Sequence, residues 1–144
     1  MTPTDVVHTA LEHLLSKNMT AFAGLWAIDG VIEFPFAAPG YPPRLEGRGA
    51  IEDYMRGYPD ILDMREVTSQ TMHVTTDPEV VVVEFEVAGI VPATAAPYEL
   101  GYIAVITVRG GEIMKYRDYW SPLAAADALG SVDGVTAAFA GDRA

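Results

Sequence analysis

The spacing of apolar residues predicts three helices in the first part of the chain. Thr2 and Asp5 form a capping-box pattern, and the apolar residues that follow recur at helical intervals as far as Lys17. Asn18 can cap a second, shorter helix, and a third helix is predicted to follow the Pro/Gly-rich segment 37–49 and to end at Pro59. The apolar stripes consist of Val6, Val7, Ala10, Leu11, Leu14 and Leu15; Met19, Phe22, Leu25 and Trp26; and Ile51, Tyr54, Met55 and Tyr58.

Beyond the third helix the pattern changes to the alternation that is typical of β-strands. Turn signals at Asp77-Pro78, in the segment PATAAP and at Gly110-Gly111 separate four such segments. They predict a meander of four antiparallel strands. A further short strand, VIEFPF at 31–36, is predicted after a turn at Asp29-Gly30. The four long segments are 65–76, 79–91, 98–110 and 113–123.

The order of these elements predicts an α+β fold. Helices come first and strands follow, so we expect a mostly antiparallel sheet, curled into a cone, packed on the N-terminal helices. The open end of such a cone is a natural pocket. We assign residues 1–130 to this single domain, with a last helical turn or two at 123–129, and residues 131–144 to a C-terminal tail.

Composition narrows the classes of function. The 144-residue chain has a net charge of −11, which disfavours nucleic acid and anionic membrane surfaces as partners. It contains no cysteine. Its N-terminal segment lacks the basic region of a signal peptide and is interrupted by Asp5, His8, Glu12 and His13, which disfavours a membrane span, so we expect a cytoplasmic location. Half of the residues are hydrophobic, which in a short chain predicts a lined pocket and a homodimer formed through the valine-rich sheet.

Asp118 is the most informative polar residue. Tyr116, Asp118 and Trp120 share one face of the last strand, whereas Lys115 and Arg117 leave by the other face. The alternative is that Asp118 pairs with one of these basic residues at the surface. If the two aromatic residues face the interior, Asp118 is desolvated, its pKa rises, and it becomes a candidate general acid or base near neutral pH.

Other candidates accompany Asp118. Tyr54, Tyr58 and Tyr102 are either core aromatics or hydroxyl donors in the pocket, and His73 is either structural or an assistant in catalysis. Glu84 and Glu86 share one face of their strand; they lie outside the sheet or place one carboxylate in the pocket. We expect Asp118, Tyr54 and His73 to be catalytic. The predicted substrate-binding residues are Trp26, Phe34, Tyr58, Tyr102, Tyr116 and Trp120.

No motif predicts a metal or an organic cofactor. The histidines lack ligand spacing, and there is no cysteine to hold zinc. The serines lack the G-x-S-x-G context of a nucleophile, and no glycine loop suits a phosphate. We therefore expect chemistry that uses side chains alone.

Two segments give the chain a family resemblance. LWAIDGVIEFPFAAPGYPPRLEGRGAIEDYMRGYP, in which Gly47-Arg48-Gly49-Ala50-Ile51 opens a helix, resembles the front half of SnoaL-like proteins. PYELGYIAVITVRGGEIMKYRDYWSPL resembles their back half. Together the segments place residues 3–128 near the polyketide cyclases and phenazine-biosynthesis A/B proteins of the nuclear transport factor 2 and ketosteroid isomerase superfamily.

The resemblance implies a cone-shaped α+β barrel, usually a homodimer, with a deep apolar pocket. Members isomerise steroids, cyclise polyketides, open epoxides or simply bind a ligand. The acid/base position of the cyclases and of the phenazine proteins falls on Asp118. The chain lacks the Asp-Arg-Asp set of the epoxide hydrolases, and no pair of carboxyls matches the ketosteroid isomerases.

Three hypotheses for function follow. The first is an enzyme that isomerises, cyclises or condenses a small apolar carbonyl compound by proton transfer through Asp118. The second is a non-catalytic domain that binds a small hydrophobic molecule in the same pocket. The third is a protein-interaction module.

Overall fold

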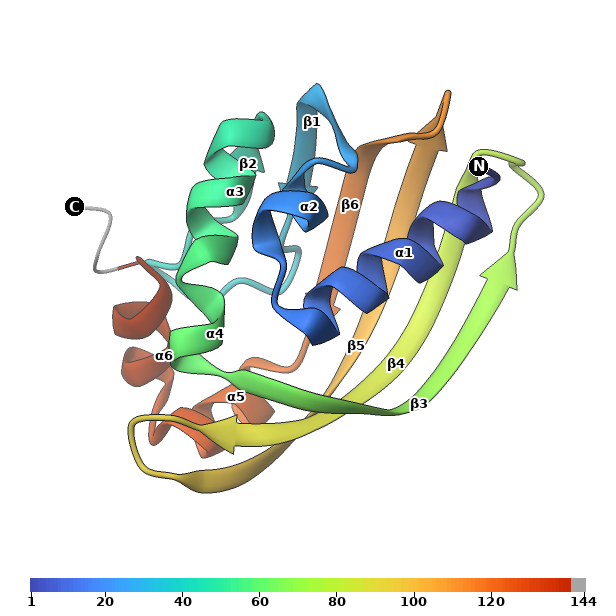
Figure 1. Ribbon diagram of the computed structural model, residues 1–144. Helices are drawn as coiled ribbons and strands as arrows, with labels where there is room; N and C mark the ends of the chain where they lie inside the picture. Colours follow the sequence, from blue (N-terminus) through green and yellow to red (C-terminus); the bar gives the residue numbers. More distant parts are fainter. Residues whose placement is uncertain (141–144) are drawn as a thin grey trace.

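The computed structural model describes residues 1–140 and confirms the α+β class. Figure 1 shows α1 and α2 lying across the concave face of a curled sheet, with α3 beside them. The helices are α1 (Pro3–Ser16), α2 (Met19–Ala23), α3 (Arg48–Arg56), α4 (Tyr58–Ile61), α5 (Pro122–Leu129) and α6 (Val132–Ala140). The strands are β1 (Trp26–Glu33), β2 (Arg44–Glu46), β3 (Asp63–Val74), β4 (Val80–Val91), β5 (Ala96–Arg109) and β6 (Glu112–Trp120).

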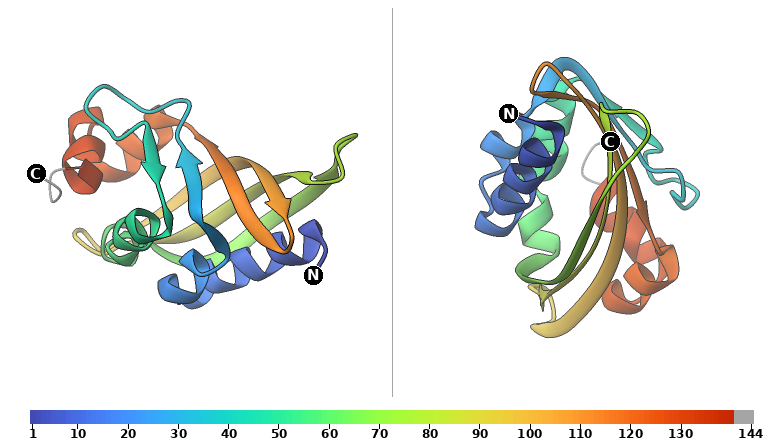
Figure 2. Two further views of the ribbon diagram at one scale, coloured as in Figure 1. Left: turned by 90° about the horizontal axis from the view of Figure 1, so that it is seen from above. Right: turned by 90° about the vertical axis from the view of Figure 1, so that its right-hand side faces the viewer.

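The sheet has six strands in the order β2-β1-β6-β5-β4-β3. Strands β3 to β6 form the predicted antiparallel meander. Strand β1 joins it in parallel with β6, and the short β2 pairs with β1 at the edge. The strong curl of the sheet, visible in Figure 2, leaves the space between sheet and helices for the core.

The predicted turn at Asp29-Gly30 is instead an irregularity within β1. The strand runs through these residues, and its register against β6 shifts between Trp26 and Val31. A Cβ on Gly30 would lie 2.8 Å from both the Ile113 carbonyl oxygen and the Trp26 ring. Glycine is therefore required here by the close approach of β6 and an indole, and no chain reversal occurs.

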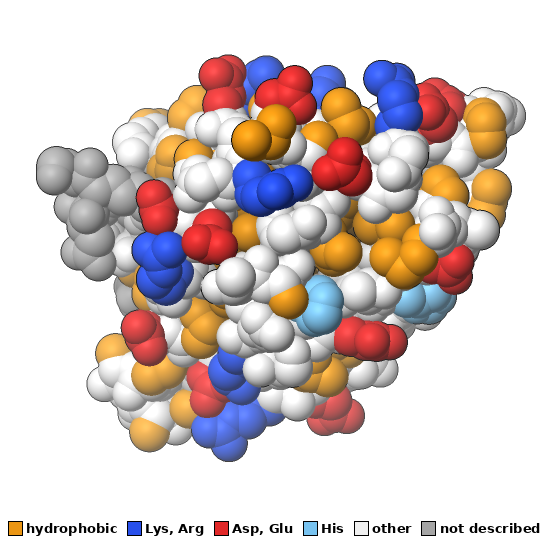
Figure 3. Space-filling view, turned by 45° about the horizontal axis from the view of Figure 1, so that its top comes forward, with side chains coloured by type: hydrophobic (Ala, Val, Ile, Leu, Met, Phe, Trp, Pro, Cys, Tyr) orange, Lys and Arg blue, Asp and Glu red, His pale blue; other side chains and the backbone are white. Residues whose placement is uncertain are grey.

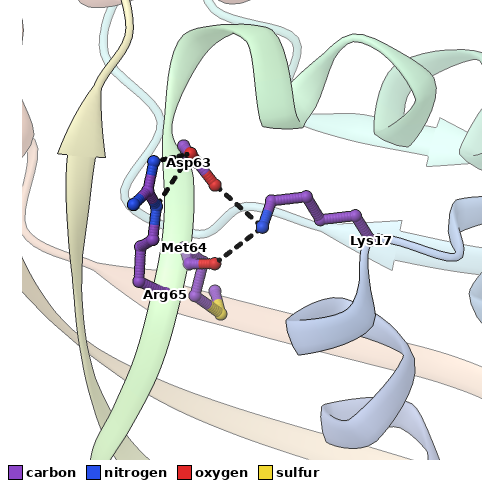
Figure 4. A network of polar contacts seen from close by, with 4 residues as sticks. All are labelled: Lys17, Asp63, Met64 and Arg65. Atoms are coloured by element: carbon purple, nitrogen blue, oxygen red, sulfur yellow. Dashed lines mark hydrogen bonds and ion pairs between the residues drawn. The ribbon is translucent and has the colours of Figure 1, made fainter. Parts of the chain in front are cut away.

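Capping and an ion-pair network fix α1. The Thr2 capping box is present, and Lys17 ends the helix in the left-handed conformation. Figure 4 shows the Lys17 ammonium reaching the Asp63 carboxylate, 2.8 Å away, and the Met64 carbonyl. Arg65 donates two hydrogen bonds to the other oxygen of Asp63. This network joins the end of α1 to the beginning of β3.

The C-terminal segment is helical and takes part in the core. Ser121 caps α5, and Gly130, in the left-handed conformation, ends it. The predicted tail contains α6, whose Val135 and Phe139 are buried in the same core as the sheet. Residues 141–144 of that tail lie outside the described residues.

Charged side chains of both signs are interspersed on the face seen in Figure 3. No helix among residues 1–140 is long and apolar enough to cross a membrane.

Candidate active site

Side chains of strand β6 alternate between the two faces of the sheet, as the sequence pattern predicted. Tyr116 is buried, and Tyr116, Asp118 and Trp120 all border space inside the cone. Lys115 and Arg117 project to the other face, where both approach the Glu33 carboxylate. The surface pairing of Asp118 with either basic residue therefore does not occur.

The Asp118 carboxyl lies in an apolar interior. Its Oδ1 atom is buried and has no hydrogen-bond partner among residues 1–140. The residue keeps some accessible surface and lines two small, partly open cavities. Desolvation raises the pKa of Asp118 from 3.8 to about 7, so the group exchanges a proton near neutral pH.

The two cavities meet around Asp118, Tyr58 and Tyr102, which line both of them. The first has a volume of about 40 Å³ and extends toward α1, α2 and α3. The second, of about 30 Å³, extends toward the C-terminal helices. The first is also lined by Leu14, Phe22, Ile32, Phe34, Tyr54, Met55, Met64, Phe85 and Tyr116, and the second by Tyr41, Leu62, Leu100, Trp120, Ala125, Val135 and Phe139.

Tyrosine hydroxyls form two pairs near the carboxyl. The Tyr58 and Tyr102 hydroxyls are 2.7 Å apart, and the Tyr41 hydroxyl bonds the Tyr54 hydroxyl. Within such a pair one hydroxyl donates and the other keeps its own proton for a third group. Burial is the main cause that raises the pKa of Tyr54, Tyr58 and Tyr102, so these groups remain neutral donors.

The fold explains why Tyr102 and Asp118 line the same cavities. On the β5–β6 ladder, Tyr102 pairs with Trp120 and Ala104 pairs with Asp118, so Tyr102 is the diagonal neighbour of the carboxylate on one face. Tyr58 comes from the opposite wall, at the beginning of α4, so the Tyr58–Tyr102 pair bridges helix and sheet.

The predicted binding residues fall into two groups. Phe34, Tyr58, Tyr102, Tyr116 and Trp120 line one or both cavities, as does the predicted catalytic Tyr54. Trp26 does not line either of them. Its indole is completely buried between Phe22 and Tyr116, with ring centroids 4.8 and 5.6 Å away, so it supports the wall from behind.

His73 is not brought to Asp118. It is exposed, and its Nε2 lies 2.7 Å from the Glu84 carboxylate on the outer face of the sheet. Glu84 and Glu86 are exposed as well, so neither enters the cavities. They line a groove of about 600 Å³ on that outer face, together with Phe36, Ser69, Thr71, Phe85, Gly101, Tyr102, Ile103, Tyr119, Trp120, Ser121 and Pro122.

Among the lining residues that were not identified from the sequence, Tyr41 and Phe139 come from segments for which no inward face was predicted. Tyr41 belongs to the Pro/Gly-rich loop and closes the second cavity against Trp120, with ring centroids 5.3 Å apart. Phe139 belongs to α6 and lies within 6.0 Å of the rings of Tyr41, Tyr54 and Tyr58. The i, i+4 spacing of Val135 and Phe139 is the signal that could have placed Phe139 inside.

Among residues 1–140 there is no group of three or more His, Asp or Glu side chains arranged to hold a metal ion. The arrangement around Asp118 offers one proton carrier and several neutral hydrogen-bond donors in an apolar space.

Residues 7–116 match the family model of the SnoaL-like domain, and the chain therefore belongs to the SnoaL-like family. It is 40% identical over 126 residues to the uncharacterised protein YesE of Bacillus subtilis, covering 88% of this chain and 86% of that protein. It is 34% identical over 133 residues to an uncharacterised PhzA/B-like protein of Pseudomonas aeruginosa, covering 92% and 94%.

Solved structures share the fold. A provisionally assigned isomerase from Bacillus subtilis superposes with a TM-score of 0.83 at 37% identity, covering 90% of this chain and 96% of that one. A provisionally assigned polyketide cyclase from Pseudomonas putida gives 0.76 at 18% identity, covering 89% and 98%. A hypothetical protein with a ketosteroid isomerase-like fold from Catenulispora acidiphila, in complex with trimethylamine, gives 0.74 at 20% identity, covering 92% and 98%. The resemblance stated from the sequence is confirmed.

Proposed function

We propose that the protein is an acid/base enzyme that isomerises or cyclises a small, largely apolar carbonyl compound without a cofactor. The observation that carries this proposal is the Asp118 carboxyl, buried beside the Tyr58–Tyr102 hydroxyl pair with its Oδ1 unpartnered. The family's cyclase-like and isomerase-like structures support the same class of reaction.

In the proposed reaction, ionised Asp118 removes a proton from the carbon next to the substrate carbonyl. The electron pair moves onto the carbonyl oxygen, and the hydroxyl pair donates a hydrogen bond to that developing charge. In an isomerisation, neutral Asp118 returns the proton to a different carbon. In a ring closure, the enolate carbon attacks a second carbonyl, whose oxygen takes the proton. A pKa of about 7 suits both directions of transfer.

The test is turnover of a panel of small ketones and diketones by the wild-type protein and by Asp118→Asn. Because the amide keeps the shape but cannot carry the proton, turnover falls by about 10²–10⁴-fold. Glu84→Gln, which changes an exposed carboxylate on the outer face, is the matched control and keeps full activity. Equal loss in the two variants, or none in Asp118→Asn, would contradict the proposal.

A second candidate function is non-catalytic binding of a small organic cation. The cavity toward α6 is lined by the five rings of Tyr41, Tyr58, Tyr102, Trp120 and Phe139 around one carboxylate, and such aromatic surroundings attract ammonium groups. The trimethylamine in the Catenulispora structure supports this alternative. Calorimetry with choline and its neutral carbon isostere separates the two functions. Cation binding is the better description if the protein binds choline but not the neutral isostere, if this binding appears only above pH 7, and if Asp118→Asn abolishes it.

We further propose that the protein works in the cytoplasm as a homodimer joined through the outer face of the sheet. The outer groove contains the exposed side chains of Phe36 and Ile103. Glu84 and Glu86 lie on its β4 side, and Arg117 projects from β6 on the same face. A two-fold axis can set the acidic strand of one copy against the basic strand of the other.

A further inference from the structure

The space beside Asp118 is too small for the proposed substrate as the protein stands. The two cavities measure about 40 and 30 Å³. Pockets that enclose organic ligands have volumes of about 300–1,000 Å³. Some part of the wall must therefore move before a carbonyl compound can reach the carboxyl.

Helices α5 and α6 are the part of the wall best suited to move. The sheet side is fixed by continuous strand pairing, and α1 buries five side chains against it. Among the described side chains of α5 and α6, three are buried: Ala125, Val135 and Phe139. The two helices follow residue 116, where the family match ends, and they meet at Gly130, which has a φ of 95°. Elements with little buried surface open at low cost.

Phe139 separates the inside from the outside at this point. Its ring lines the cavity that contains Asp118, and it also lines a surface groove of about 500 Å³ between α3–α4 and α6. The side chain is 7% exposed and is held between the rings of Tyr54 and Tyr58. In Figure 1, α6 lies next to α4 at the end of the molecule where this groove runs. Tyr54 likewise lines both the groove and the other cavity.

We propose that Phe139 is the gate of the site: ligands enter through the groove between α3–α4 and α6 when α6 turns outward about Gly130 and withdraws the phenyl ring. Withdrawal joins the cavity to the groove and provides the missing volume. The ring also limits the size of the ligand that can be held once α6 closes. This inference rests on the proposed site at Asp118 but on neither the reaction nor the ligand.

A single introduced thiol measures the opening, because the chain has no cysteine of its own. Leu100 lies on the sheet side of the cavity that Phe139 closes and is 6% exposed, so Leu100→Cys reports access from the groove. Ala10→Cys, on α1 and 2% exposed, is the matched buried control remote from α6. Methyl methanethiosulfonate is the probe, and the rate of modification is followed by mass spectrometry.

With Phe139 present, the thiol at position 100 reacts at least about 10-fold faster than the thiol at position 10, and low denaturant does not change its rate, because the opening is local. Phe139→Ala raises the rate of thiol modification at position 100 by a further 10-fold or more. Phe139→Leu, which keeps a large apolar side chain, gives a rate close to that measured with Phe139. Phe36→Ala, in the outer groove, leaves the rate at position 100 unchanged. Equal rates at the two positions, with equal dependence on denaturant, would show that only global unfolding exposes the cavity and would overturn the gate. That result is obtained even if Phe139→Ala does not fold.

The outcome is independent of the proposed enzyme. Thiol access requires no substrate, so a closed gate together with Asp118-dependent turnover would reject the gate alone. An open gate in a protein that turns over no carbonyl compound would reject the reaction and keep the route.

Discussion

At the scale of single residues, Asp118 makes the stability of the protein depend on pH. Its pKa is about 7 in the fold and 3.8 when unperturbed, so between these values the folded form holds a proton that the unfolded form has lost. The contribution of Asp118 to stability is therefore expected to fall as the pH rises from about 4 to about 7. The difference between the two pKa values corresponds to about 4 kcal/mol.

We expect Asp118→Asn to be more stable than the wild type at pH 8, by up to about 4 kcal/mol, and equally stable near pH 4, where both side chains are neutral. Urea unfolding at the two pH values measures this difference. A variant that is less stable at pH 8 would mean that the carboxylate is paired in the fold.

Tyr58→Phe removes one hydroxyl of the bridging pair and leaves the ring in place. If the pair stabilises the developing oxyanion, turnover falls by about 10²–10³-fold, the usual effect of losing one such donor. The free energy of unfolding falls by only about 1 kcal/mol, for one neutral hydrogen bond. Tyr54→Phe is the comparison, because the Tyr54 hydroxyl belongs to the other pair and lies in one cavity only. A greater loss of turnover in Tyr54→Phe would transfer the role to Tyr54.

The inward direction of Asp118 could be predicted because alternation along one strand is a local property. The placement of His73 could not, because it depends on the register between strands. Pairing of Met72 with Val83 puts Met72 on the inner face and sends His73 outward to Glu84. Nothing within β3 alone specifies that register.

At the scale of elements, two strand glycines allow a matched comparison. A Cβ on Gly89 in β4 would lie 2.1 Å from the Asp63 carbonyl oxygen and 2.9 Å from the Tyr98 ring. A Cβ on Gly101 in β5 would have Glu86 Cγ, 3.9 Å away, as its nearest neighbour. We therefore expect Gly89→Ala to cost about 1–3 kcal/mol or more, as overpacking does, and Gly101→Ala to be neutral or slightly stabilising. Thermal unfolding measures the stability of both variants. Equal melting temperatures of Gly89→Ala and Gly101→Ala would contradict the close approach of the Asp63 carbonyl oxygen to position 89.

The long elements and the short capped helices α2 and α5 could be predicted from the sequence, whereas β2 and α6 could not. α1 and the four long strands carry clear periodicity over many residues, and α1 has its own cap. β2 is three residues long and exists because β1 lies beside it. α6 consists largely of small residues, so its apolar stripe is indistinct. Its place beside Tyr54 and Tyr58 is determined by the packing of residues far apart in the chain.

At the scale of the whole molecule, we predict that two copies of the chain associate through the outer face of the sheet. Ile103→Glu places a charge in the outer groove, so we expect light scattering to show a dimer for the wild type and a monomer for this variant. Ile28→Glu, at a side chain that is 79% exposed and outside that groove, is the control and stays dimeric. A wild-type mass that remains that of one chain at every concentration would contradict the dimer.

The position of β6 in the sheet has a consequence for biosynthesis. β6 lies between β1 and β5, yet it is the last strand to be translated, at residues 112–120. Until it leaves the ribosome, β1 and β5 each expose an unpaired edge, and the N-terminal strand cannot join the meander. The strand that carries Asp118 thus joins the two halves of the sheet. A nascent chain that stalls before residue 112 would expose these unpaired strand edges to chaperones and would lack the carboxyl of Asp118, although it already contains Tyr58 and Tyr102.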